Sequence, residues 1–271
     1  MLDEWLVELV KQLRKRLPQS GGRNLWRLVI RILKILRLPH VGRDRLARIL
    51  RENGLKVSRA KSFNRQTTYS NHSYAVQNNS YRELNITGPE QALVADITYI
   101  PVKGGNGYLF LITDAYSRRI VGYHLSDSLS HQGAIRALEM ALETIPNPKG
   151  IIHHTDRGVQ YCCHNFLDAI SKWDMKASMT DDDHCAQNAL AERMNGILKQ
   201  EFLFYRPFPS IALAEQAIKD AVFNYNHLRI HGALDSKTPT EVHFGHDYAI
   251  EIWAKQLSSY DLPPHPYRTH V

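Results

Sequence analysis

The chain has 271 residues and a hydrophobic fraction of 43%, which predicts a globular protein with a sizeable core and excludes a disordered chain. No apolar run approaches the ~18 residues that span a bilayer, and the N-terminus lacks the basic start and apolar centre of a signal peptide. The three cysteines are an odd number without a framework spacing, which fits a reducing cytosol. We therefore expect a cytosolic protein that does not bind membranes.

The charge is spread unevenly along the chain. Residues 1–85 hold 18 Lys and Arg against 6 Asp and Glu, whereas residues 86–271 hold 16 against 21, within a formal net charge of +7. A basic first third joined to an acidic remainder predicts an N-terminal segment that binds phosphate, followed by a larger part of the chain that binds metal. The alternative is that the basic residues form a solvated helical face.

The first 56 residues are predicted to form a small, basic, all-helical domain. Apolar residues recur at helical spacing over residues 1–17, 24–36 and 43–53, and glycine or proline separates the segments. Two short basic helices across a tight break are typical of a helix-turn-helix, whose second helix enters a major groove. The predicted DNA contacts on that helix are Arg43, Arg45, Arg48 and Arg51. The alternative is a helical bundle that only braces the rest of the chain.

Residues 57–89 are rich in Ser, Asn, Thr and Tyr and show no clear periodicity. We expect this segment to be a linker that follows DNA and is disordered when no DNA is bound.

Residues 90–246 alternate between strand and helix patterns. Strands are expected at 92–100, 108–115, 119–125, 150–154 and 175–179, and helices at 130–145, 161–173, 188–199 and 210–227. Short turns make the first three strands an antiparallel meander, and the later strand–helix–strand order implies parallel neighbours. The pattern predicts a mixed five-stranded sheet flanked by helices, followed by a C-terminal tail at 247–271.

Three carboxylates stand out in residues 90–246. Asp96 is a lone charge in the middle of an apolar strand, where an unpaired charge is costly to bury. Asp156 follows a short apolar run, and Glu192 lies on the helix face opposite its apolar residues. Lys199 lies two helical turns after Glu192, roughly 10 Å along the axis. Carboxylates are the ligands that Mg²⁺ prefers, and two such ions can activate the attacking and leaving oxygens of a phosphodiester.

The order and spacing of several motifs resemble the second-frame product (OrfB) of insertion-sequence-three-type transposases, which have a retroviral-integrase-like DDE core. Asp156 and Glu192 are separated by 35 residues, which is the family's spacing. The matching motifs are Asp96-Ile97-Thr98-Tyr99, Thr113-Asp114-Ala115-Tyr116-Ser117-Arg118, His154-Thr155-Asp156-Arg157-Gly158-Val159-Gln160-Tyr161, Asn188-Ala189-Leu190-Ala191-Glu192, Leu198-Lys199-Gln200-Glu201-Phe202, Tyr225-Asn226-His227-Leu228-Arg229 and Thr238-Pro239.

The resemblance implies a ribonuclease H-like fold and a DDE polynucleotidyl transferase that cleaves DNA at the ends of an insertion sequence and transfers the strand. Asp96, Asp156 and Glu192 would be catalytic and would hold two Mg²⁺ ions, with Mn²⁺ as the alternative ion. Lys199 would hold DNA near the scissile phosphate, and Asp114 would support the acids without binding metal.

The resemblance also implies partners. These are the element ends, the target DNA and further copies of the chain on DNA, in the cytosol and nucleoid of a bacterium. The family's active protein is usually a frameshifted fusion with an upstream product. No such segment precedes Met1, so we expect this chain to be a part, or an inhibitor, of the working enzyme.

Two departures from the family pattern are visible. Leu93 stands where a tryptophan is usual, and Gln187 stands where an aspartate is often found; neither replaces one of the three acids. Two other functions stay open, namely a non-catalytic DNA-binding regulator and a ribonuclease H-like nuclease that only hydrolyses. The consecutive Asp181, Asp182 and Asp183 are expected to lie in a solvated loop, because adjacent residues do not converge on one ion.

Overall fold

The computed structural model describes residues 2–57, 74–181 and 185–257. The chain divides into two compact units. The helical unit comprises Met1–Ala60, Glu201–Leu203 and Asp220–Val271, and the sheet unit comprises Lys61–Gln200 and Phe204–Lys219. In this division residues 220–246 belong with the N-terminal helices, whereas the sequence placed them with the strands in residues 90–246.

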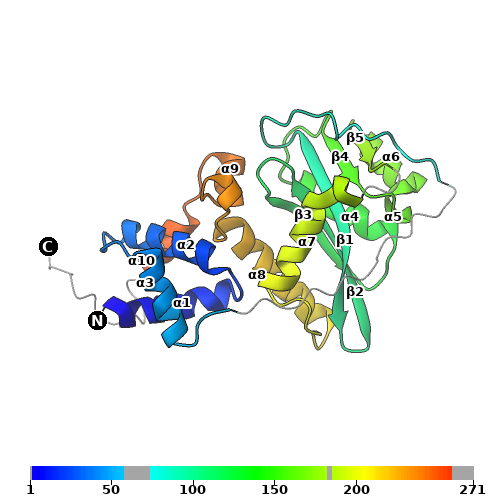
Figure 1. Ribbon diagram of the computed structural model, residues 1–271. Coiled ribbons are helices and arrows are strands. Elements are labelled where there is room, and N and C mark those ends of the chain that lie inside the picture. Colours follow the sequence, from blue (N-terminus) through cyan, green and yellow to red (C-terminus); the bar gives the residue numbers. More distant parts are fainter. Residues whose placement is uncertain (1, 58–73, 182–184, 258–271) are drawn as a thin grey trace. The chain divides into compact units, whose positions relative to one another are not determined.

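The sheet unit is built on a mixed five-stranded sheet, as predicted, with the order β3-β2-β1-β4-β5 (Figure 1). β1 pairs antiparallel with β2, and β2 with β3, whereas β4 lies parallel to β1, and β5 to β4. The strands are β1 (Ala92–Val102), β2 (Gly105–Asp114), β3 (Ile120–Ser126), β4 (Ile152–Thr155) and β5 (Lys176–Met179).

The hairpin between β1 and β2 is tighter than the sequence suggests. β2 begins at Gly105 and not at Tyr108, and Gly105 pairs directly with Val102. Only two residues are left for the turn, and Gly104 there has a φ of +89°, a conformation that glycine adopts without steric cost. The glycine-rich stretch predicted as a loop is therefore partly strand.

Helices cover one face of the sheet. They are α4 (His131–Leu142), α5 (Val159–Cys162) and α6 (His164–Lys172), and their buried apolar residues form one core with those of the sheet. Close packing depends on Gly122 of β3, since a Cβ there would lie 2.1 Å from the carbonyl oxygen of Ala137 on α4. The predicted single helix over 161–173 is two helices, because Cys163 is extended and caps α6.

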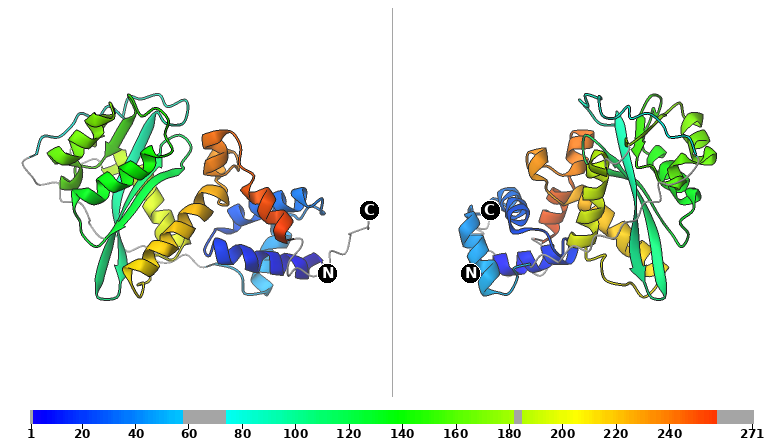
Figure 2. Two further views of the ribbon diagram at one scale, coloured as in Figure 1. Left: turned by 180° about the vertical axis from the view of Figure 1, so that it is seen from behind. Right: turned by 45° about the vertical axis from the view of Figure 1, so that its right-hand side comes forward.

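The opposite face is covered by α7 (Ala189–Glu201) and by residues 74–86, here called the strap (Figure 2, right). Tyr81, Leu84 and Ile86 of the strap pack against a smaller cluster of buried residues on that face. The ring of Tyr81 stacks on that of His154, with centroids 4.6 Å apart. The second half of the predicted linker is thus packed on the sheet. Residues 58–73, where the rest of that linker falls, lie outside the described residues.

The helical unit gathers its core from both ends of the chain. Its helices are α1 (Leu2–Arg16), α2 (Gly22–Ile35), α3 (Arg43–Glu52), the second part of α8 (Ile211–His227), α9 (Pro239–Phe244) and α10 (Ala249–Leu257). α1, α2 and α3 agree with the predicted helices, whereas α9 and α10 were not predicted. Trp253, assigned to the tail, is buried on α10, and the Arg16 guanidinium lies over its ring. None of the described helices has the length and apolar character to cross a membrane.

Two ion pairs join the separate pieces of the helical unit. Arg229 donates to both carboxylate oxygens of Glu201, at 2.6 and 2.8 Å, and its side chain is only 5% exposed. Arg31 of α2 pairs with Glu241, which also completes a capping box with Thr238 at the start of α9. Bidentate geometry makes such pairs strong, and their burial makes the loss of one partner costly.

We expect Glu201→Gln to destabilise the protein by about 3–5 kcal/mol, because it leaves the Arg229 charge buried without a counter-ion. Glu251→Gln is the matched control. It breaks the exposed pair with Lys255 in the same unit, and should cost less than ~1 kcal/mol. Denaturant unfolding of the full chain measures both, and equal small losses would show that the Arg229–Glu201 pair is not structural.

Candidate active site

The first two predicted acids lie side by side at the junction of two parallel strands. Val94 of β1 pairs with His154 of β4, and Asp96 and Asp156 each follow that pair by two residues. Because parallel neighbours lie roughly 4.8 Å apart, the register brings the two carboxylates to the same edge of the β1–β4 pair. Both side chains are half-buried.

The turn after β4 holds Asp156 in place. The Asp156 Oδ1 accepts a hydrogen bond of 3.0 Å from the backbone N–H of Gly158, and a Cβ at Gly158 would itself lie 3.0 Å from that oxygen. The next residue, Arg157, donates from Nε to the carbonyl oxygen of Thr180, at 2.7 Å. The Thr-Asp-Arg-Gly sequence therefore builds a turn that fixes the Asp156 carboxylate just after β4.

The third acid is brought in by α7, which is fastened to β1 by two asparagines. Asn188 donates from Nδ2 to the carbonyl oxygen of Ala95 at 3.0 Å, and Asn195 donates from Nδ2 to Oδ2 of Asp96 at 2.8 Å. The two asparagines are seven residues apart, so they share one face of the helix. Glu192 lies in the first turn between them and is exposed.

Asn195 is a site residue that the sequence reasoning missed. Its position was the available signal, because it lies three residues after Glu192 and seven after Asn188 on the predicted helix. It contacts the Asp96 carboxylate directly and so couples the helix that carries Glu192 to the strand that carries Asp96.

Negative charge is concentrated at this site. Burial, followed by the negative charge of Asp156, raises the pKa of Asp96 from its ordinary 3.8 to about 7. The hydrogen bonds from Asn195 and from the backbone of Ile97 oppose this rise, and the charge of Glu192 adds to it. The three predicted acids therefore interact electrostatically, although they come from three separate elements.

Two buried residues of α5 experience the negative charge of Asp156. Tyr161 and Cys162 of α5 are buried, and burial together with the charge of Asp156 raises the pKa of both. For Cys162 the pKa reaches about 11, so the thiol stays protonated at neutral pH.

The oxygen-rich donor set fits a hard divalent cation, since a cation would relieve the mutual repulsion that raises the pKa of Asp96. Within the described part of the chain, however, no three His, Cys, Asp or Glu side chains are gathered closely enough to hold a metal ion as they stand.

Asp114 has a clear structural position. Its Oδ1 accepts hydrogen bonds from the backbone N–H and the hydroxyl of Ser117, at 2.7 and 2.6 Å, and its Oδ2 accepts one from the backbone N–H of Glu90 at 2.7 Å. Asp114 therefore anchors the turn between β2 and β3 and ties it to the segment before β1. Its support of the acids stays a prediction.

The predicted DNA contacts lie in both units. Lys199 is half-buried on α7. On α3, Arg45 and Arg48 pair with Asp3 of α1 at 2.6 and 3.5 Å, Arg48 also pairs with Glu52, and Arg43 pairs with Asp44. All four arginines of α3 are exposed, and exposed ion pairs are weak. These pairs therefore do not prevent the arginines from binding phosphate.

Known proteins resemble this chain over most of its length. Residues 86–185 and 174–239 each match an integrase core domain family. "Insertion element IS600 uncharacterized 31 kDa protein" of Shigella sonnei is 36% identical over 201 residues, which span 73% of this chain and 74% of that protein. "Transposase InsF for insertion sequence IS3A" of Escherichia coli (strain K12) is 31% identical over 181 residues, 66% of this chain and 61% of that protein.

A solved structure confirms the fold. One chain of the cryo-electron microscopy structure of the simian T-cell lymphotropic virus intasome, in complex with the PP2A regulatory subunit B56 gamma, matches with a TM-score of 0.51. It is 19% identical and covers 85% of this chain and 72% of that chain. At this identity the match bears on the fold alone. Together with the sheet order, it identifies the sheet unit as ribonuclease H-like.

The raised pKa of Asp96 predicts a pH-dependent stability in the metal-free protein. A carboxyl group whose folded-state pKa lies above its unfolded value stabilises the fold below about pH 3.8, and this contribution is lost as the pH rises to about 7. Asp96→Asn should therefore raise the thermal midpoint in EDTA relative to wild type, and more at pH 8 than at pH 5. Asp168→Asn, at an exposed position on α6, is the control. The same midpoint difference at both pH values would contradict the burial of a charged Asp96.

Proposed function

Because this chain belongs to the insertion-sequence-three-type transposases with an integrase-like core, we propose that it is a DDE polynucleotidyl transferase that cuts and joins DNA at the ends of an insertion sequence. The observation that carries this proposal is the convergence at β1. The β1–β4 register places Asp156 beside Asp96, and Asn195 binds the helix of Glu192 to Asp96. Carboxylates held near one another are the ligands that phosphodiester chemistry with divalent metals uses.

In this proposal Asp96, Asp156 and Glu192 would hold two Mg²⁺ ions, or Mn²⁺, which would polarise the scissile phosphate and lower the pKa of the attacking water or hydroxyl. Water first attacks a phosphodiester at the element end, so that one P–O bond forms and the bond to the 3′-oxygen breaks. The freed 3′-hydroxyl then attacks a phosphate of the target strand, and that strand's own 3′-oxygen leaves. Asn195 holds the Asp96 carboxylate in position in both steps, and Gly158 holds that of Asp156.

The proposed partners are the element ends, the target DNA and further copies of this chain assembled on the DNA, together with an upstream-frame product. Lys199 lies on the same helix as Glu192 and is proposed to hold a phosphate beside the acids. Arg43, Arg45, Arg48 and Arg51 give α3 a row of exposed cations, which supports the proposal that this helix binds the DNA backbone or major groove.

Asp156→Asn tests the acids. The amide keeps an oxygen for the Gly158 N–H, so the turn should persist, while one metal-binding charge is lost. We expect no cleavage and no joining of element-end DNA in Mg²⁺. DNA affinity should be unchanged or slightly higher, because negative charge near phosphate is removed. Strand transfer at the wild-type rate by this variant would refute the assignment, and a gel-based joining assay with fluorescence binding measures both quantities.

Lys199→Gln and Arg51→Gln test the DNA contacts. Each phosphate contact contributes about 0.9 to the slope of log K against log salt, so each substitution should lower that slope by about one. Lys199→Gln should in addition slow joining by roughly 10–100-fold, the effect of losing a charge-assisted contact at the reacting phosphate. Lys255→Gln, at an exposed position on α10, is the control for a general charge effect. An unchanged salt slope in either test variant would exclude that residue as a phosphate contact.

A further inference from the structure

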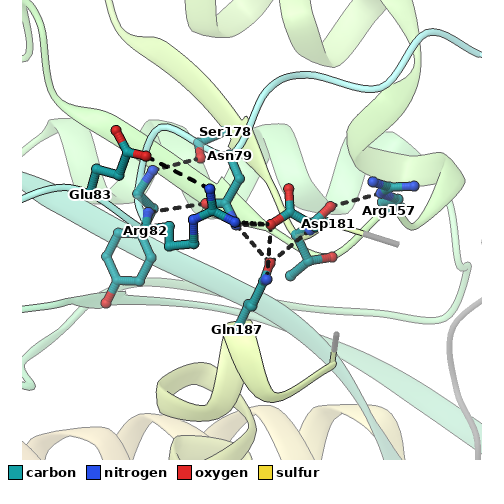
Figure 3. Close-up of polar contacts among 9 residues, drawn as sticks. Asn79, Arg82, Glu83, Arg157, Ser178, Asp181 and Gln187 are labelled. Carbon is teal, nitrogen blue, oxygen red and sulfur yellow. Dashed lines mark hydrogen bonds and ion pairs between the residues drawn. The ribbon is translucent and has the colours of Figure 1, made fainter. Parts of the chain in front are cut away.

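The side chain of Gln187 lies at the centre of a polar network just before α7 (Figure 3). Its Oε1 accepts hydrogen bonds from Nδ2 of Asn79 at 2.6 Å and from the backbone N–H of Asp181 at 2.7 Å. Its Nε2 donates to Oδ2 of Asp181 at 2.9 Å. The amide thus uses donor and acceptor together to join the strap, through Asn79, to the end of the segment that follows β5.

The strap holds this segment at further points. Arg82 donates to Oδ2 of Asp181 at 3.2 Å, and the backbone N–H of Tyr81 donates to Oγ of Ser178 on β5 at 3.2 Å. Asp181 is held as a carboxylate, since the hydrogen bond from Gln187 lowers its pKa, with smaller contributions from Asn79 and Arg82. The partner that Gln187 faces is therefore an anion, which requires a donor opposite it.

The network continues directly into the proposed active site. Asn188 follows Gln187 in the short helix η1 (Cys185–Asn188) and binds the carbonyl oxygen of Ala95, the residue before Asp96. α7 begins at the next residue, and Glu192 lies in its first turn. A shift at Gln187 would therefore be passed to the helix that carries Glu192.

We propose that Gln187 is a positioning residue, which uses the strap to fix the start of α7 and so the place of Glu192 relative to Asp96. That this placement of Glu192 matters for catalysis rests on the proposed function. It also explains the departure of Gln187 from the aspartate often found at this position. An aspartate has no donor, and beside the Asp181 carboxylate it would create a repulsion where Gln187 makes a hydrogen bond. Gln187 and Asp181 are a matched pair in this chain.

The sharpest test is the isosteric change Gln187→Glu. It keeps the acceptor for Asn79 but turns the donor facing Asp181 into a second carboxylate. Metal-dependent joining should slow about tenfold or more, and the Mg²⁺ concentration for half-maximal rate should rise, because Glu192 is displaced. Affinity for element-end DNA should not change. Adding Asp181→Asn to Gln187→Glu restores a donor–acceptor pair, and should recover most of the rate and the original Mg²⁺ dependence.

Hydrogen–deuterium exchange gives a readout that does not depend on activity. In the Gln187→Glu variant, the amides of Asp181 and of the first turn of α7 should exchange several-fold faster, and the double variant should return them towards wild type. Gln132→Glu is the matched control, since it makes the same substitution at an exposed position in the first turn of α4. It should change neither the exchange nor the joining rate.

The outcomes separate this inference from the proposed function. Wild-type joining and exchange in Gln187→Glu, with an inactive Asp156→Asn, would overturn the positioning role and leave the function standing. If Gln187→Glu joins DNA slowly and the added Asp181→Asn does not restore the rate, the positioning role is also overturned. The slow joining would then not arise from the contact between Gln187 and Asp181. If the wild-type protein joins no DNA, the proposed function fails, and the exchange measurements still decide whether the strap fixes α7.

Discussion

The structure of the site depends on a carboxylate held in the middle of a strand. Asp96 lies among apolar neighbours of β1, and the register with β4 sets Asp156 beside it. Two like charges in a half-buried place repel each other, and this repulsion adds to the effect of burial in raising the pKa of Asp96 to about 7. The hydrogen bonds to these two carboxylates offset part of the free-energy cost of burying them side by side. Asn195 and the Ile97 N–H bind the Asp96 carboxylate, and Gly158 binds that of Asp156.

The residues of the recurring motifs divide into two groups by what they contact. Asp96 is influenced by the charges of Asp156 and Glu192, whereas Glu201 and Arg229 bind each other in the helical unit and Asp114 closes a turn. Charged residues of both groups look alike in the sequence. The distinction comes from the position in the fold, since Asp96 and Asp156 lie where β1 and β4 pair, whereas Glu201 and Asp114 hold other parts of the chain together.

Much of this arrangement could be predicted from the sequence, because it rests on local periodicity. The five strands and the three N-terminal helices follow from alternation and helical spacing, and the isolated charge in β1 draws attention to Asp96. The break at Cys163 could not be predicted, since the apolar positions continue through it and only the backbone of that residue departs from helix. The packed strap and the bond from Asn195 to Asp96 depend on contacts between residues distant in sequence, which no local pattern encodes.

The division of the chain also sets an order of folding during synthesis. The sheet unit ends at Lys219, whereas the helical unit needs α1, α2 and α3 together with residues that follow Asp220. A ribosome therefore releases every strand of the sheet before it releases α9 and α10, and the basic N-terminal helices, although made first, complete their core last. Domains usually fold in the order in which they emerge. In this chain the N-terminal helices cannot complete their core until the residues after Asp220 have emerged, and by then every residue of the sheet unit has been made.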